Sequence, residues 1–124
     1  MNANQKLLAL LNASQIDFKT ITHAPTLTSI ESAQVRGASL ASGAKAMICS
    51  INDEQIVMCV LAADKKISYA LLKAHFKVKN LTLLDVKKLE ELTGCLVGAV
   101  PPFGSLFGIK TILDPSLIEQ GEEM

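Results

Sequence analysis

The stretch AKAMICSINDEQIVMCVLA, which runs from Ala44 to Ala62, decides the fold because two short apolar runs flank a polar break. The break is NDEQ, from Asn52 to Gln55. Nearly continuous apolar runs of this length are typical of strands that are buried on both faces. A short polar connection between two such runs is typical of a hairpin turn. The sequence therefore predicts a hairpin of two mostly buried strands.

The patterns on either side of this hairpin predict helices interleaved with further strands. A leucine stripe from Leu7 to Leu11 predicts a first helix that ends around residues 12–14. The other predicted helices are one over 28–36, with a capping box at Thr28 and Glu31 and a stop at Gly37, one from about Asp64, one between Asp85 and Gly94, and a final turn at Asp114-Pro115. The other predicted strands are DFKTITH (17–23), CLVGAV (95–100) and LFGIKTIL (106–113). Strands in pairs with helices between them predict an α+β fold, with a mixed, largely antiparallel, barrel-like sheet and surrounding helices.

The longest charge-free stretch, from Leu92 to Ile109, raises the question of a membrane helix. It contains Gly94, Gly98, Gly104 and Gly108 and the pair Pro101-Pro102. Glycine weakens a helix, and the prolines remove backbone donors, so the freed carbonyls would have no partner inside a bilayer. The stretch instead predicts a strand, a rigid loop and a second strand, with both flanks buried.

Composition predicts one folded domain over residues 1–124, because hydrophobic residues make up 49% of the chain and charged residues only 19%. The formal net charge is zero, so DNA binding is not expected and any contact with RNA must be small and local. The three cysteines lack paired spacing, and the N-terminal apolar run is too short for a secretory signal. We therefore expect a cytoplasmic protein with no membrane segment and no disulfide framework.

No cluster of residues predicts nucleophilic or metal-assisted catalysis. The only histidines are His23 and His75, and neither has a serine or cysteine at a recognisable spacing. No HExxH motif, cysteine pair or phosphate-binding loop occurs, so no metal and no cofactor are expected. Lys45 stands out as a lone charge at the start of an apolar strand. It either extends to water from the strand end or projects into a cleft to hold a phosphate or carboxylate, and spacing leaves both readings open.

Four short motifs follow one another along the chain: THAP (22–25), TSIESA (28–33), GAK (43–45) and TGCLVGAVPPFG (93–104). In this order the sequence resembles the YbaK/prolyl-tRNA synthetase editing-domain superfamily from about Thr22 to Ile118. Free-standing members of that superfamily hydrolyse mischarged aminoacyl-tRNA. The resemblance therefore implies a trans-acting aminoacyl-tRNA deacylase that binds the 3′ acceptor end, with an aminoacyl-tRNA synthetase as a partner that could deliver the substrate.

The resemblance also implies roles for particular residues. Lys45 matches a lysine near the 3′-terminal adenosine, and Gly98 and Pro102 match the ends of a GxxxP loop that positions the ester; these are the predicted catalytic residues. The predicted substrate-binding residues are His23, Thr28 and Glu31 at the pocket edge and Ala99, Val100, Pro101, Phe103 and Gly104 in the loop. We expect Gly98 to Gly104 to form a stiff shelf of backbone groups, with a tight structural turn as the alternative. An aminoacyl ester is already activated, so positioning and backbone electrostatics can suffice.

The substrate that we expect is tRNA(Pro) carrying a wrong small amino acid. Ala46 follows Lys45 where relatives that clear alanine have asparagine, so alanine itself is not favoured. Two alternatives from other classes remain: a non-catalytic module that binds the tRNA acceptor end or a synthetase, and a small-molecule-binding protein that reuses the pocket. Incubation with mischarged tRNA(Pro) species separates the enzyme from both.

Overall fold

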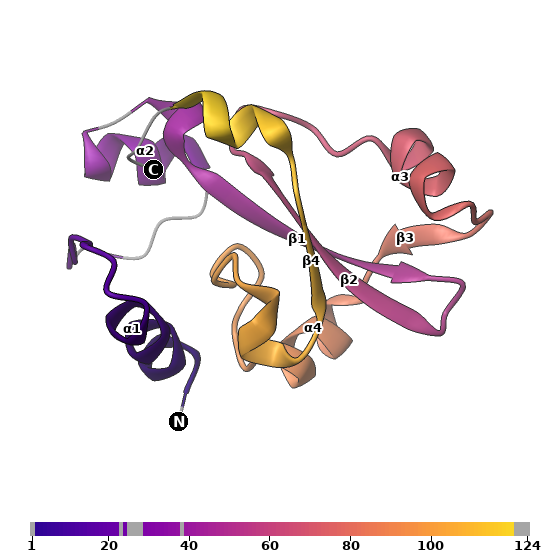
Figure 1. Ribbon diagram of the computed structural model, residues 1–124, viewed down its shortest axis with the longest axis horizontal. Helices are drawn as coiled ribbons and strands as arrows, with labels where there is room; N and C mark the ends of the chain where they lie inside the picture. The colour runs from indigo at the N-terminus through magenta and orange to yellow at the C-terminus, as the bar shows by residue number, and fades with distance from the viewer. Residues whose placement is uncertain (1, 23, 25–28, 38, 121–124) are drawn as a thin grey trace.

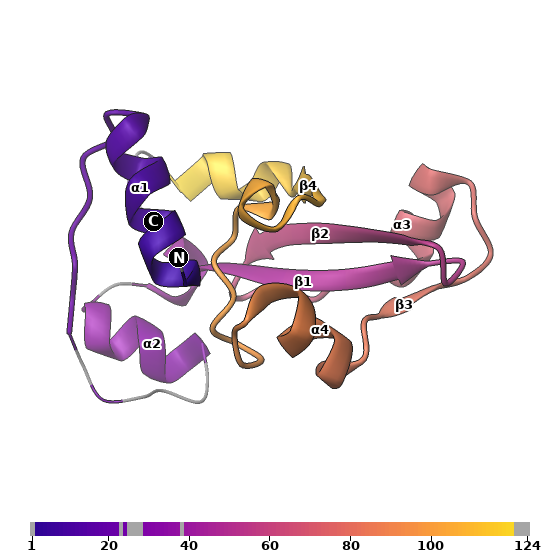
Figure 2. The ribbon, with the colours of Figure 1, turned by 90° about the horizontal axis from the view of Figure 1, so that it is seen from below.

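The computed structural model describes residues 2–22, 24, 29–37 and 39–120, and a four-stranded sheet forms its centre (Figures 1 and 2). The strands are β1 (Ala44–Ile51), β2 (Gln55–Ala62), β3 (Leu81–Leu83) and β4 (Lys110–Leu113), in the order β3-β1-β2-β4. β1 is antiparallel to β2 and β3, whereas β2 and β4 are parallel. The predicted α+β fold with a mixed, largely antiparallel sheet is confirmed. Over the described residues the sheet stays open at β3 and β4, so the barrel-like closure is not formed there.

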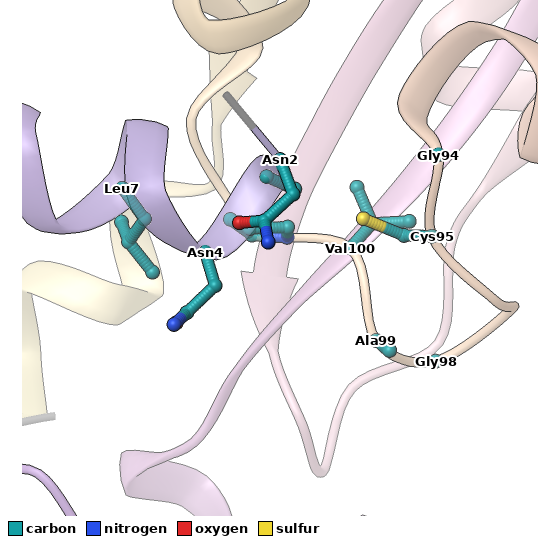
Figure 3. A pocket seen from close by; sticks show the side chains of 10 residues that line it. Asn2, Asn4, Leu7, Gly94, Cys95, Gly98, Ala99 and Val100 are labelled. Carbon is teal, nitrogen blue, oxygen red and sulfur yellow. The ribbon is translucent and has the colours of Figure 1, made fainter.

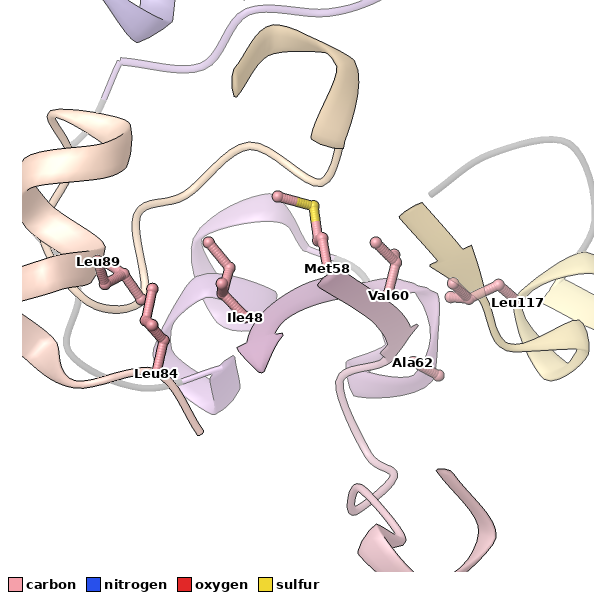
Figure 4. Packing of buried hydrophobic residues seen from close by; sticks show 7 residues of the cluster. All are labelled: Ile48, Met58, Val60, Ala62, Leu84, Leu89 and Leu117. Atoms are coloured by element: carbon pink, nitrogen blue, oxygen red, sulfur yellow. The ribbon is translucent and has the colours of Figure 1, made fainter. Parts of the chain in front are cut away.

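The predicted hairpin is β1 and β2, and its side chains alternate between two apolar clusters. The first cluster contains Ile48, Met58, Val60, Ala62, Leu84, Leu89 and Leu117 (Figure 4). The second, on the opposite face of the hairpin, contains Cys49, Ile51, Val57, Cys59 and Leu81. At the turn, Asn52 and Asp53 have positive φ values of 51° and 57°, which these two residue types tolerate better than most.

Within the described residues four α-helices surround the sheet: α1 (Ala3–Ala13), α2 (Ser29–Arg36), α3 (Tyr69–Phe76) and α4 (Val86–Thr93). Short 3₁₀ helices span Leu40–Ser42, Gly104–Phe107 and Pro115–Gln120. The predicted first helix and final turn are confirmed, and α2 and α4 end at Gly37 and Gly94, whose φ values are +64° and +69°. Thr28 of the predicted capping box lies outside the described residues. Asp85 is at the N-cap of α4, but its side chain makes no capping hydrogen bond.

The third helix begins at Tyr69 rather than near Asp64, so its predicted start is wrong. Ser68 caps it, because its hydroxyl oxygen accepts a hydrogen bond from the Leu71 amide at 3.3 Å. Before this cap, Ile67 already packs against the second cluster, as Leu72 and Phe76 do from the helix itself. The chain after β2 therefore turns at residues 63–65, and the helix begins only where the serine supplies the cap.

Two of the predicted strands are wrong. The described part of DFKTITH, residues 17–22, is neither helix nor strand, and Phe18 and Ile21 are exposed. An alternating pattern makes a strand only where a neighbouring strand accepts its backbone hydrogen bonds, and none of the described strands pairs with this segment. CLVGAV is also no strand, because a turn interrupts it; Leu96 and Val97 are 70% and 61% exposed, so this flank is not buried.

LFGIKTIL is a strand only in its second half. Residues 104–107 form a 3₁₀ helix that ends at Gly108, with φ of +69°, and β4 begins after it at Lys110. In the part of the chain that the structure describes, no helix is long and apolar enough to cross a membrane. The charge-free stretch thus folds as the last two residues of α4, a turn, a proline-containing loop and a 3₁₀ helix.

Candidate functional site

The loop between α4 and the 3₁₀ helix at 104–107 is built around Gly98. The Ala99 amide donates to the Leu96 carbonyl at 3.0 Å, which closes a turn whose third residue, Gly98, has φ of +85°. A positive φ at this position is the reason that such turns favour glycine. After the turn Val100 packs against the first cluster, and the Phe103 amide donates to the Pro101 carbonyl at 2.8 Å. The loop is therefore fixed at both ends.

A hollow of about 500 Å³ lies between this loop and the first turns of α1 (Figure 3). From the helix it is lined by Asn2, Ala3, Asn4 and Leu7, and from the loop by Gly94, Cys95, Gly98, Ala99, Val100 and Pro101. The N-terminal end of α1 is held by a capping box, in which the Asn2 side chain accepts from the Gln5 amide at 2.8 Å. Helix and loop thus form two defined walls of one open site.

Two backbone amides in the loop wall are available to a ligand. Within the described residues, the N–H groups of Gly98 and Val100 donate no hydrogen bond. Both residues line the hollow, and Gly98 has no side chain to separate a ligand from the backbone. Amides held in a fixed loop can stabilise negative charge on a bound oxygen at little reorganisation cost. The loop wall is therefore suited to a carbonyl or an oxyanion.

The structure brings four of the sequence-predicted site residues together: Gly98, Ala99, Val100 and Pro101 line the same hollow. Pro102 and Phe103 continue the loop and are half-buried outside the lining. Gly104 is buried against β4, where its amide donates to the Thr111 hydroxyl at 2.8 Å. The second half of the predicted shelf is thus directed into the protein.

Lys45 is not in the hollow. Its neighbours Ala44 and Ala46 pack against the first cluster, as Val100 does, and successive side chains of a strand point to opposite faces. Lys45 therefore points to the face of the second cluster, where its Nζ donates to the Lys65 carbonyl. Glu31 is exposed on α2 and does not line the hollow either, and His23 and Thr28 lie outside the described residues.

The comparison with known families identifies the kind of domain to which this loop and hollow belong. The model of the aminoacyl-tRNA editing domain matches residues 23–123, most of the chain. The protein belongs to this family. The resemblance read from the sequence motifs is confirmed, and with it the class of enzyme: an editing hydrolase that acts on the ester bond of aminoacyl-tRNA.

Relatives of this editing domain include a characterised enzyme. The multifunctional Ser/Thr-tRNA deacylase ProXp-y of Escherichia coli (strain K12) is 34% identical over 98% of this chain and 74% of its own length. Among solved structures, hypothetical protein APE2540 matches with a TM-score of 0.75 and 27% identity, over 87% of this chain and 71% of that one. A candidate trans-editing enzyme for prolyl tRNA synthetase matches with a TM-score of 0.79 at 19% identity, over 96% and 76% of the two chains, which shows the shared fold.

The sequence reading missed the helical wall of the hollow and Cys95. The leucine stripe of α1 predicted a helix but not what it packs against, and none of its residues is fully buried. Asn2 and Asn4 lie far from the loop along the chain, so no local pattern links them to it. Cys95 was read with its flanking run as part of a strand. No signal in one sequence marks these residues as site residues.

The other two cysteines do not line the hollow. Cys49 and Cys59 are buried in the second cluster on adjacent strands. The hydrogen bond to Cys59 and burial raise the pKa of the Cys49 thiol, which therefore stays protonated. Over the described residues, no group of three or more histidine, cysteine, aspartate or glutamate side chains is placed to hold a metal ion.

Proposed function

We propose that this editing domain hydrolyses the ester of seryl- or threonyl-tRNA in the hollow between α1 and the loop at 94–101. The observation that carries the proposal is the pair of unpaired amides, from Gly98 and Val100, in the wall of that hollow. The identity to a Ser/Thr-tRNA deacylase over nearly the whole chain supports the choice of amino acids. Water adds to the ester carbonyl, the ribose oxygen leaves with a proton, and the products are free amino acid and tRNA.

The chemistry asks little of protein side chains, because an aminoacyl ester is already activated. The loop amides would stabilise the negative charge that develops on the carbonyl oxygen, a contribution worth about 3 kcal/mol for one well-placed donor. The capped α1 and the loop would hold the ester and water in line with each other. No protein nucleophile is required. Among the residues that line the hollow only Cys95 carries a nucleophilic atom, and no histidine of the described residues lines it to act as a base.

The hollow suits a small polar side chain. Gly94 and Gly98 contribute no side chain to its wall, and the polar groups that line it include the Asn4 carboxamide and the Cys95 thiol. Such groups can hydrogen-bond a hydroxyl, and a site built to do so rejects an analogue that lacks it. Serine and threonine fit this description better than alanine.

The carrier tRNA is the second part of the proposal. The sequence resemblance favours tRNA(Pro), cleared in the cytoplasm after a synthetase has attached the wrong small amino acid. The neutral net charge makes delivery by a synthetase useful, because a protein with few phosphate contacts binds tRNA weakly on its own. A panel that varies the tRNA and the amino acid independently separates carrier preference from amino-acid preference.

The test is a panel of tRNA(Ser), tRNA(Thr) and tRNA(Pro), each charged with serine, threonine or alanine. We expect fast deacylation of seryl and threonyl esters and slow deacylation of alanyl esters. Fast deacylation of tRNA(Pro) carrying any of the three amino acids would instead show that the enzyme selects the tRNA and not the amino acid. Binding of every species without hydrolysis would instead favour the non-catalytic alternative.

Cys95 allows a test of the hollow that uses no tRNA variant. Its thiol is partly exposed in the lining, whereas Cys49 and Cys59 are buried, so iodoacetamide should modify Cys95 first. The added group occupies the hollow, and we expect deacylation to fall at least tenfold. The deacylation rate of the Cys95→Ala protein should be the same before and after treatment with iodoacetamide. Equal activity of the wild-type protein before and after complete Cys95 alkylation would place the site elsewhere.

Lys45 remains a predicted catalytic residue. Its hydrogen bond to the Lys65 carbonyl offers a structural role as the alternative. We expect Lys45→Ala to lower deacylation of full-length tRNA at least tenfold with an unchanged melting temperature, because the variant loses a cation that can pair with phosphate. Lys45→Arg should recover part of the rate, and Lys110→Ala, at the exposed start of β4, is the matched control. If Lys45→Ala instead lowers the melting temperature and the activity together, the role of Lys45 is structural, because its hydrogen bond links β1 to the segment after β2.

A further inference from the structure

A neutral protein can still carry a basic surface, and this chain has one between Asp64 and Asp85. The segment contains Lys65, Lys66, Lys73, Lys77 and Lys79 together with His75, and no aspartate or glutamate. The compensating acidic residues therefore lie elsewhere in the chain. Local potential, rather than net charge, decides where a polyanion binds. We call this segment, residues 65–79, the basic segment.

The basic segment crosses one face of the protein. It begins beside Lys45, whose Nζ donates to the Lys65 carbonyl, and runs from the end of β2 to α3 at the other end of the sheet (Figures 1 and 2). Lys65, Lys66, Lys77 and Lys79 are exposed. Among the described residues, none of the lysines of the segment pairs with a carboxylate.

Lys73 adds a shaped element to this surface. It lines a hollow of about 350 Å³ with Tyr69 of the same helix and Leu81, Thr82 and Leu83 of the edge strand β3. Tyr69 and Lys73 are four residues apart and so lie on the same side of α3. A cation, a phenol and a hydroxyl group around one hollow match the groups of a sugar–phosphate unit.

Helix stability explains only part of the segment. Lys73 and His75 lie in the last turn of α3, where positive charge interacts favourably with the helix dipole. Lys65, Lys66 and Lys79 lie outside the helix. Lys77 is at the C-cap in the left-handed conformation, with φ of 57° and ψ of 46°, where glycine is strongly favoured. Ending the helix does not explain a lysine at this position, because glycine would serve that role better.

We propose that the basic segment binds the phosphate backbone of the tRNA acceptor strand. This proposal rests on the proposed function, because it identifies the surface that holds the rest of the substrate while the 3′ end enters the hollow. Lysines act as flexible point charges that follow a backbone without reading its sequence. The acceptor strand would cross the end of the sheet at Lys45 and continue along residues 65–79.

The first test uses the strain at Lys77. Lys77→Gly relieves the left-handed conformation and removes a positive charge, so we expect a higher melting temperature together with weaker binding of uncharged tRNA. Gln15→Gly is the matched control, because Gln15 also has a positive φ, 56°, and carries no charge. It should raise the melting temperature and leave tRNA affinity unchanged. Equal tRNA affinity of Lys77→Gly and wild type overturns the role of Lys77.

The second test compares two charge removals of the same size. Lys73→Gln/Lys79→Gln should weaken binding of uncharged tRNA about tenfold at low salt and flatten the slope of log K against log salt by about 1 to 2, since each phosphate contact contributes about one unit. Lys87→Gln/Lys88→Gln on α4, where Glu90 and Glu91 balance the lysines, should bind as the wild type does. Equal losses of affinity in both double variants overturn the proposal.

Hydrolysis of 3′-seryl-adenosine by the wild-type protein keeps the two proposals apart. This short ester reports on the hollow alone, because it carries no acceptor strand. If 3′-seryl-adenosine is hydrolysed but the lysine substitutions do not change tRNA binding, the proposed function is supported and the role of the basic segment is overturned. If the lysine substitutions weaken tRNA binding but 3′-seryl-adenosine is not hydrolysed, the role of the basic segment is supported and the proposed function is overturned.

Discussion

Gly98→Ala is expected to lower kcat/KM for seryl-tRNA about 100-fold, because a methyl group on the loop wall displaces the ester from the amides of Gly98 and Val100. A Cβ built at Gly98 meets no other atom within 4 Å, so the methyl causes no clash inside the protein. It would lie on a residue that lines the hollow, where the ester has to approach the backbone. The loss of rate would therefore come from the site and not from repacking.

Stability has to be controlled, since Gly98 has φ of +85° and alanine pays about 1 to 2 kcal/mol in the left-handed region. Gly108→Ala is the matched control. Gly108 also has a positive φ, +69°, and open space around its Cβ position, but it does not line the hollow. Both variants should lose similar melting temperature, and only Gly98→Ala should lose deacylation. Similar activity of the two variants at a temperature where both are folded would reduce the Gly98 loop to a structural turn.

The hairpin and the ends of two helices could be predicted because their causes are local. The two apolar runs at 44–62 and the turn between them are contiguous, so pattern and turn chemistry point to the same pairing. Gly37 and Gly94 end α2 and α4 because glycine adopts the left-handed conformation cheaply. Tertiary context changes none of these choices.

Where the prediction failed, a distant partner decides the structure. Residues 17–22 alternate as a strand does, but a strand forms only beside another strand. The local pattern does not reveal whether such a partner lies beside this segment. Apolar side chains on both faces of β1 hide which face carries the loop at 94–101, so the sequence could not show that Lys45 points away from it. The helical wall of the hollow was missed for the same reason.

The predicted shelf divides into two halves with different physical roles. Gly98 to Pro101 lines the hollow, and there an added atom meets solvent or substrate. Gly104, which the sequence resemblance also assigned to substrate binding, is buried against β4. Substitutions at Gly98 and Gly104 should therefore separate activity from folding within one loop.

Gly104→Ala is expected to destabilise the folded protein by about 3 kcal/mol, at the upper end of typical overpacking costs. A Cβ at Gly104 would lie 2.3 Å from the Thr111 hydroxyl oxygen and 2.5 Å from the Ile109 carbonyl oxygen. The second contact is with backbone, so no change of rotamer relieves it. Because small domains have only about 5 to 15 kcal/mol of stability, the loss should be plain in urea unfolding.

Thr111→Ala separates the two contacts that make Gly104 necessary. Alone, it removes the acceptor of the Gly104 amide, which should cost about 1 kcal/mol for the lost hydrogen bond. In the double variant Gly104→Ala/Thr111→Ala, the clash with the hydroxyl is gone but the clash with the Ile109 carbonyl remains. We expect the double variant to be less destabilised than the sum of the single variants and still well below wild type. A Gly104→Ala protein with wild-type unfolding in urea and reduced deacylation would return Gly104 to the substrate-binding residues.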